Sequence, residues 1–206
     1  TFWFDLREKI GPTEFLGYDA ERTEGIISAI IIDGETTDIA KEGDEITLIV
    51  NQTPFYAESG GQKGDRGIAM GAFGAKLKVT DTKKKLDDMH LHSAKVVHGE
   101  ISVGAVLDLE VDKACRKKLS VNHSVTHLMH SALRETLGVH VMQKGSLVAA
   151  EYLRFDFSHQ KPVEGDELRL VEVSVNKQIR GNGCVNTLLM TPDDAVETGA
   201  LALFGE

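Results

Sequence analysis

The sequence has 206 residues, of which 41% are hydrophobic and 27% charged, and its formal net charge is -9 at pH 7. Such a length suits either one large domain or two small ones, and the hydrophobic content is sufficient for packed cores. The acidic balance argues against a general nucleic-acid binder, because non-specific affinity comes mainly from lysine and arginine side chains that neutralise phosphates. Any contact with RNA is therefore expected to be local.

Neither a membrane segment nor a secretory signal is indicated. There is no run of about 18 apolar residues, and the N-terminus lacks a basic flank followed by a long apolar stretch. We therefore predict a soluble protein of the cytoplasm, with neither membrane nor DNA as a partner. The two cysteines, Cys115 and Cys184, lie far apart in the sequence and are predicted to be free thiols.

Short apolar stretches separated by turn signals dominate the first half of the chain. They predict strands at residues 25–32, 45–50, 75–80, 95–100 and 106–111. Evenly spaced short strands favour a closed or nearly closed antiparallel barrel, because closure removes exposed edges. We place this barrel at residues 18–113.

The pattern changes at residue 113, where we place a domain boundary. Apolar residues then recur at near-helical spacing up to Gly138, a plausible end for a helix. Strands are predicted at 146–148 and 152–157, and the ambiguous stretch 163–180 is long enough to favour a helix. Thr191 as N-cap before Pro192 predicts a last helix. The fold class is thus α+β, a small antiparallel barrel followed by an α+β domain.

His123 and His127 are the first candidates for chemistry. Their separation by four positions places both imidazoles on one face of the predicted helix, about one turn apart, where they can share a metal ion. For an isolated pair at this spacing, coincidence is the commoner explanation. A zincin protease is disfavoured further, because Ser124 occupies the position of the glutamate that serves as general base.

Three linked motifs add a more specific signal. They are Asn-His-Ser-Val-Thr-His-Leu-Met-His at 122–130, Gln-Lys-Gly-Ser-Leu-Val at 143–148 and Leu-Arg-Phe-Asp-Phe-Ser-His at 153–159. In order and spacing they resemble the editing domain of alanyl-tRNA synthetases. The glycine-rich segment 55–67 and the segment 13–18 also resemble this family, so that the resemblance covers essentially the whole chain.

The resemblance implies a domain organisation and a function. Residues 1–17 would be a linker from a preceding domain, 18–113 the barrel, and 114–206 an editing domain that is incomplete at its C-terminus. The implied activity is a zinc-dependent aminoacyl-tRNA deacylase that hydrolyses mischarged Ser-tRNA(Ala) and Gly-tRNA(Ala). Its partner would be the acceptor end of tRNA(Ala), whereas ATP would be used only by the aminoacylation domain, which the resemblance does not cover.

The resemblance also implies residue roles. His123 and His127 would supply two ligands to Zn²⁺, Thr126 would lie beside the ester, and Gln143 would help to distinguish serine from alanine. A hydroxyl and an amide can both hydrogen-bond a serine side chain that alanine lacks. Ordinary structural roles stay open: Thr126 as a helix hydroxyl bonded back to the chain, and Gln143 as a cap after the helix end.

The sequence departs from the family in one respect. The family completes its metal site with a Cys-x-x-x-His motif, which does not occur here, and the surroundings of Cys184 do not match it. The zinc site is therefore half present, and activity of the chain alone is not implied. Two alternatives follow: a non-catalytic tRNA-binding fragment, and a free-standing trans-editing factor, which the N-terminal Phe2-Trp3-Phe4 cluster disfavours.

Two further features bear on RNA binding. The glycine-rich segment 55–67 is either a tight barrel turn or a loop packed against the editing cleft or the RNA end. Local positive charge could come from several side chains that the motifs place nearby, although each alone is more often an ordinary surface residue. These candidates are Arg116, Lys117, Lys118, Lys144 and Arg154.

Overall fold

The computed structural model describes residues 2–199, which divide into two compact units. The first, which we call the barrel unit, comprises the chain up to Val121 together with Leu147–Tyr152. The second, which we call the histidine unit, comprises Asn122–Ser146 and the chain from Leu153 onward. No helix of the described part of the chain is long and apolar enough to cross a membrane.

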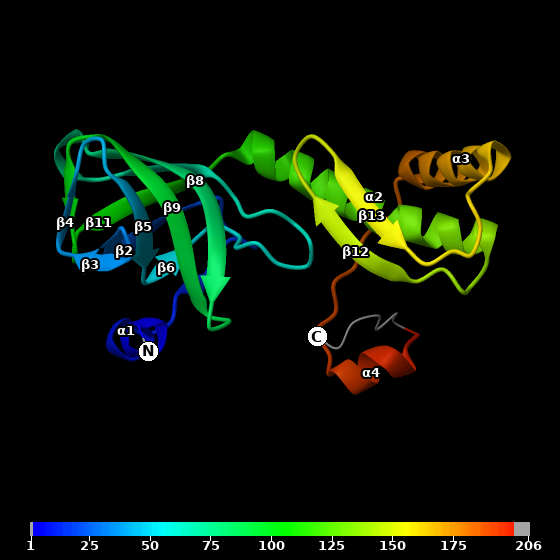
Figure 1. Cartoon of the computed structure of the whole chain (residues 1–206), viewed down its shortest axis with the longest axis horizontal. Coiled ribbons are helices and arrows are strands. Elements are labelled where there is room, and N and C mark those ends of the chain that lie inside the picture. Colours follow the sequence, from blue (N-terminus) through cyan, green and yellow to red (C-terminus); the bar gives the residue numbers. More distant parts are fainter. Residues whose placement is uncertain (1, 200–206) are drawn as a thin grey trace. The chain divides into compact units, whose positions relative to one another are not determined.

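A closed ring of antiparallel strands forms the barrel unit (Figure 1). Its members are β2 (Arg22–Ile32), β5 (Glu45–Val50), β7 (Gly67–Met70), β8 (Lys76–Lys85), β9 (Met89–His98) and β11 (Val106–Val111). The order β11-β7-β8-β9-β5-β2 closes on itself because β11 also pairs with β2. The α+β class and the antiparallel barrel are therefore confirmed, and the ring is fully closed.

Short elements surround the ring. They are α1 (Phe2–Ile10), β1 (Glu14–Phe15), β3 (Glu35–Thr37), β4 (Ile39–Lys41), β6 (Gln52–Thr53), the 3-10 turn η1 (Ala72–Gly74) and β10 (Glu100–Ser102). Strand β3 extends the sheet beside β2, β1 pairs with β6 in parallel, and β10 pairs with β4. Helix α1 lies in the segment expected to be a linker, and its buried Leu6 packs in one cluster with Ile31 and Met89.

Alternation of side chains along the strands builds the barrel core. In β8, for example, Leu77 and Val79 point inward and are buried, whereas Lys76 and Lys78 point outward. The inward positions of all six strands form one cluster around the fully buried Phe55.

Two buried histidines interrupt this apolar core. Nδ1 of His92 lies 3.1 Å from the carbonyl oxygen of Leu48, which can only accept, so Nδ1 carries the proton. Nε2 then accepts from the Thr53 hydroxyl at 2.8 Å. Burial lowers the pKa of His92 to about 4. Burial, followed by the charge of Lys84, lowers the pKa of His90 to about 4 as well.

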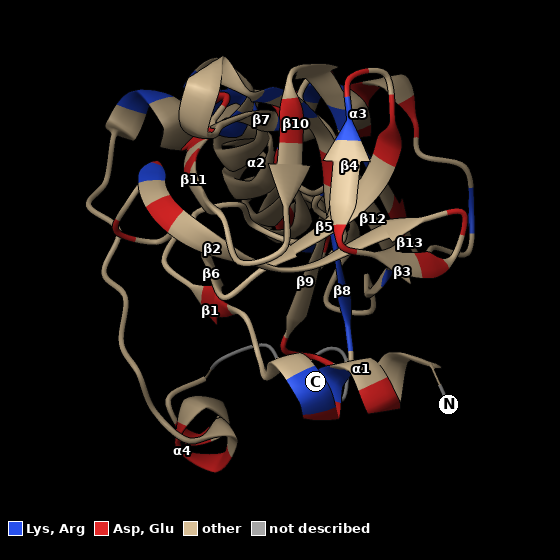
Figure 2. Ribbon diagram, turned by 90° about the vertical axis from the view of Figure 1, so that its left-hand side faces the viewer, with Lys and Arg blue, Asp and Glu red and all other residues tan. Residues whose placement is uncertain are grey.

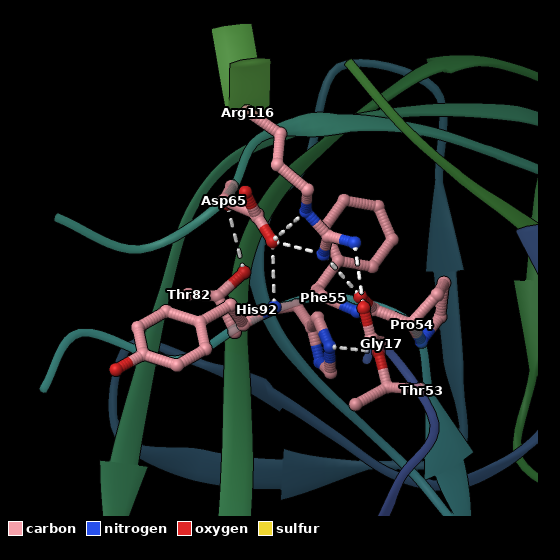
Figure 3. Close-up of polar contacts among 9 residues, drawn as sticks. Gly17, Thr53, Pro54, Phe55, Asp65, Thr82, His92 and Arg116 are labelled. Atoms are coloured by element: carbon pink, nitrogen blue, oxygen red, sulfur yellow. Dashed lines mark hydrogen bonds and ion pairs between the residues drawn. The ribbon is translucent and has the colours of Figure 1, made fainter. Parts of the chain in front are cut away.

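A buried ion pair joins the glycine-rich segment to the start of α2 (Lys113–Leu137), as Figure 3 shows. The guanidinium of Arg116 donates to the carboxylate of Asp65, whose side chain is only 1% exposed. Arg116 also donates to the carbonyl oxygens of Gly17 and Pro54. The Asp65 carboxylate accepts in addition from the backbone N–H of Tyr56 at 2.7 Å.

The remainder of the glycine-rich segment is a tight turn. Ser59 and Gln62 exchange backbone hydrogen bonds around Gly60 and Gly61, which have φ angles of 58° and 79°. These angles lie in the left-handed region that favours glycine. The turn also pairs with a later segment of the same unit, because the Val148 N–H donates to the Gly61 carbonyl at 2.7 Å.

The histidine unit contains the rest of α2, a two-stranded sheet and two more helices. These elements are β12 (Gln143–Val148), β13 (Leu153–Phe157), α3 (Gly165–Gly181) and α4 (Pro192–Glu197). Gly138, with φ +117°, follows the end of α2 as predicted. The Thr191 hydroxyl caps α4 by accepting from Asp194 N–H, also as predicted. The helical interpretation of residues 163–180 is confirmed by α3.

We expect Asp65→Ala to lower the free energy of unfolding of the barrel unit by about 3 kcal/mol, because it leaves the Arg116 charge and the Tyr56 N–H without their acceptor. Urea unfolding followed by fluorescence measures this, since the single tryptophan, Trp3, packs against the barrel unit. Glu151→Ala, which breaks the exposed pair with Lys118, is the control and should change the midpoint little. Equal losses in the two variants would contradict a special role for the buried pair.

The buried histidines predict acid sensitivity. An unfolded histidine titrates near about 6.5, whereas the folded pKa of His92 is about 4, so that between these values the unfolded state binds more protons. Stability should therefore be complete above about pH 6.5 and fall as the pH decreases toward 4. The variant His92→Gln keeps an amide that can hydrogen-bond to Leu48 and Thr53. Its loss of stability with decreasing pH, measured by urea midpoints, should be smaller than that of the original protein. An unchanged slope would show that His92 does not cause it.

Candidate functional site

His123 and His127 lie on α2 with their rings side by side. The ring centroids are 5.3 Å apart and the planes differ by 14°, so the imidazoles stack one helical turn apart. The helix is regular here because no glycine or proline interrupts residues 113–137. The predicted juxtaposition of the two histidines on one helix is thus observed.

The electrostatics of the pair keep one imidazole neutral. Partial burial, followed by the neighbouring His127, lowers the pKa of His123. A histidine must be neutral to bind a metal ion, so His123 does not have to lose a proton first at neutral pH. Two imidazoles supply half of the four-ligand shell that zinc prefers.

Thr126 lies between these histidines in the sequence and is only 4% exposed. Its hydroxyl donates to the carbonyl oxygen of Asn122, one turn earlier, at 2.9 Å. This is the back-bonded geometry of a helix hydroxyl. The bond uses the proton of the hydroxyl and leaves lone pairs of Oγ1 able to accept.

Gln143 is the first residue of β12 and is half-buried. Among the residues that the structure describes, its side chain makes no hydrogen bond, and in particular none that caps the end of α2. An amide without an internal partner keeps all its donors and acceptors for another molecule.

His130 was not singled out from the sequence. It follows His123 by seven positions and His127 by three, so it lies on the same face of α2. It is 6% exposed, packs against Phe155, and its Nε2 has no hydrogen-bond partner. Burial lowers its pKa, which keeps the ring neutral. The same helical spacing that marks the first two histidines would have found it.

The other ligand candidate, Cys184, is exposed and follows the end of α3. Within residues 2–199 no group of three or more histidine, cysteine, aspartate or glutamate side chains is arranged to hold a metal ion. In the part of the chain described, the stacked pair of His123 and His127 stays the predicted pair of metal ligands.

The basic side chains proposed from the sequence to contact RNA differ in availability. Arg116 is committed to the ion pair with Asp65. Lys118 pairs with Glu151 at 3.1 Å and Arg154 with Asp156 at 3.2 Å. Lys117 and Lys144 take part in none of the ion pairs of the described residues.

Comparison with known proteins shows to which family the chain belongs. The family model described as "tRNA synthetases class II (A)" matches residues 3–115, which is more than half of the sequence. The chain belongs to this family. The match covers α1, the whole barrel and the start of α2.

Curated relatives within this synthetase family extend the similarity to the remaining residues. The alanine–tRNA ligase of Parvibaculum lavamentivorans is 53% identical over 204 residues, and that of Mesorhizobium japonicum is 53% identical over 206. The ligase of Rhodopseudomonas palustris is 55% identical over 204 residues. These alignments cover 99–100% of this chain but 23% of each relative. The resemblance to alanyl-tRNA synthetases is thereby confirmed, and the chain spans about a quarter of the length of these ligases.

We expect the chain to hold zinc weakly, because two imidazoles leave half of a tetrahedral shell to water. Metal analysis after dialysis against a mild chelator should find little zinc. In a titration with Co²⁺, His123→Ala should remove the weak binding, whereas His98→Ala, a change at an exposed barrel histidine, should not. Stoichiometric zinc that survives dialysis would contradict this expectation and direct attention to Cys184.

Proposed function

We propose that this chain is an editing module of an alanine–tRNA ligase, which hydrolyses the ester of mischarged Ser-tRNA(Ala) and Gly-tRNA(Ala) at a zinc-dependent site. The observation that carries the proposal is the stacked pair of His123 and His127 next to the buried Thr126. The similarity of the whole chain to alanine–tRNA ligases supports it.

The need for such a module follows from the limits of binding selectivity. A pocket that accepts alanine cannot reject glycine by size, and its discrimination against one added hydroxyl is limited. A second site that hydrolyses the wrong ester supplies the missing selectivity. We assign the ATP-dependent attachment of alanine to parts of the ligase outside this chain.

Each side chain has a task within this proposal. His123 and His127 would hold the zinc ion, which when bound supplies a Lewis acid that can orient and polarise the ester or a water. Oγ1 of Thr126 accepts a hydrogen bond from the substrate, since its own proton is donated to Asn122. The Gln143 amide donates to and accepts from the serine hydroxyl.

The substrate would be the single-stranded acceptor end of tRNA(Ala), and the compartment the cytoplasm. Such an end can enter a cleft because its bases are not fixed in a duplex. Lys117 and Lys144 take part in none of the ion pairs of the described residues. They can offset the repulsion between the phosphates and an acidic protein.

Two alternatives are tested by the same measurement. A non-catalytic tRNA-binding fragment would bind tRNA(Ala) without hydrolysing the ester. A free-standing trans-editing factor would hydrolyse Ser-tRNA(Ala) without any added segment. Hydrolysis by the chain and by a version extended past Glu206, with zinc measured in both, separates the three. We expect the extended version to be the active one.

Gln143 should act on substrate choice rather than on folding. Replacing it with alanine in a full-length ligase removes the group that recognises the serine hydroxyl, and loss of such a bond costs about 1 to 3 kcal/mol. The ratio of seryl-tRNA to alanyl-tRNA hydrolysis should therefore change about tenfold or more, while the melting temperature stays nearly constant. Thr187→Ala, a change at an exposed residue, is the control. A parallel fall of both rates, or a fall of stability alone, would contradict the assignment.

A further inference from the structure

The side chain of Gln143 makes no hydrogen bond within the described residues, so its position depends on the backbone that carries it. Gln143 begins β12, and residues 140–142 connect it to the turn at Gly138 that follows α2. Of these three residues Val141 is fully buried, whereas Met142 is 44% exposed and His140 is exposed as well. Packing therefore anchors one residue of the segment, and the other two depend on hydrogen bonds.

Ser158, which follows the end of β13, holds both backbone polar groups of Met142. Its N–H donates to the Met142 carbonyl at 2.9 Å, and its hydroxyl oxygen accepts from the Met142 N–H at 3.0 Å. The hydroxyl also donates to the carbonyl oxygen of His140 at 3.1 Å. Strands β12 and β13 lie side by side, so a single serine extends their contact to the residues that precede Gln143 (Figure 1).

The next residue, His159, bonds to His140 through its ring. Nδ1 of His159 lies 2.9 Å from Nε2 of His140. The ring centroids are 5.2 Å apart and the planes differ by 18°. This centroid separation is close to the largest that such a nitrogen contact permits, so the imidazoles meet edge to edge in nearly one plane. That is the geometry of an N–H···N hydrogen bond, in which one neutral ring donates and the other accepts.

The imidazole of His159 is retained at a cost in stability. Its other nitrogen, Nε2, is buried and has no hydrogen-bond partner among the described residues. The ring lies beside Phe157, with 6.5 Å between the centroids. A buried polar atom without a partner costs about 1 to 3 kcal/mol, which a phenylalanine at this position would avoid. The bond to His140 is what a phenylalanine could not provide.

Helix α2 holds the same segment from another side. Arg134 donates to the Val141 carbonyl at 2.8 Å, and the Val141 N–H donates to the Gly138 carbonyl at 3.1 Å. The Val141 side chain packs in the core of the histidine unit. Together with the contacts from beyond β13, these bonds fix residues 140–142 on two sides. The Gln143 amide therefore extends from a fixed backbone, although it has no anchor of its own.

We propose that Ser158 and His159 are positioning residues of the editing site. By holding residues 140–142, they place the Gln143 amide where it meets the serine hydroxyl of a mischarged tRNA. The assignment rests on the proposed function, in which Gln143 recognises serine. Both residues act through the backbone in front of Gln143, so their loss weakens recognition of serine more than hydrolysis of the ester itself.

The test uses His159→Phe in a full-length ligase, a change that keeps a ring against Phe157 and removes the bond to His140. The ratio of seryl-tRNA to alanyl-tRNA hydrolysis should change about threefold or more, in the direction that Gln143→Ala produces. His98→Phe, the same change at an exposed barrel histidine, is the control and should leave the ratio unchanged. His159→Asn, whose amide can replace the Nδ1 bond, should restore most of the original ratio.

A double-mutant cycle separates positioning from a general weakening of the fold. Once residue 143 is alanine, its position no longer matters. Gln143→Ala/His159→Phe should therefore give the ratio of Gln143→Ala alone, and Ser158→Ala should behave like His159→Phe in both backgrounds. Additive effects, an unchanged ratio in His159→Phe, or a fall of the melting temperature alone would overturn the proposal.

Hydrogen exchange in the chain itself gives a measure that is independent of activity. The Met142 N–H should exchange about tenfold faster in His159→Phe than in His98→Phe, because its segment loses a bond that keeps it closed. If exchange rises in this way while no ligase variant hydrolyses seryl-tRNA, the proposed function fails and the positioning of the backbone before Gln143 stands. Unchanged exchange would overturn the positioning role.

Discussion

The barrel unit depends on one buried charge pair, between Asp65 and Arg116. Neither charge is tolerable alone in such a position, so each requires the other and the hydrogen bonds around it. Through these bonds the pair joins three segments: the entry loop at Gly17, the stretch from Pro54 through the glycine-rich segment, and the first turn of α2. Strand β8 is included as well, because the Thr82 hydroxyl donates to the Asp65 carbonyl at 2.9 Å. The strands close the ring by their own pairing, and this ion pair ties the first turn of α2 to that ring.

Charge also separates two tasks within a single acidic chain. The histidine unit offers neutral imidazoles and uncharged hydrogen-bonding groups, which suit recognition of a small aminoacyl group. The barrel unit, by contrast, concentrates lysine on one strand, since five of the ten residues of β8 are lysine (Figure 2).

Local signals explain what the sequence predicted well. Gly138, Thr191 and Pro192 act on the backbone next to them, so the helix ends that they mark were placed correctly. The spacing of His123 and His127 fixed their stacking, since helix geometry leaves little freedom at four residues.

Contacts between distant residues were not predictable. Arg116 looked like a surface cation for RNA, and only the fold brings Asp65 to it. Helix α1 was missed because nine residues with one buried side chain carry little periodicity.

The pairing of the glycine-rich turn with Val148 has a consequence for how the protein is made. The barrel unit is discontinuous: its last segment, Leu147–Tyr152, is synthesised after the first strand residues of the histidine unit. A nascent chain that has reached residue 113 already contains every barrel strand, yet Gly61 still lacks the donor that Val148 supplies. Completion of the barrel unit is thus delayed until part of the histidine unit has been made, and a chain cut between barrel and helix would leave the Gly61 carbonyl without its Val148 donor.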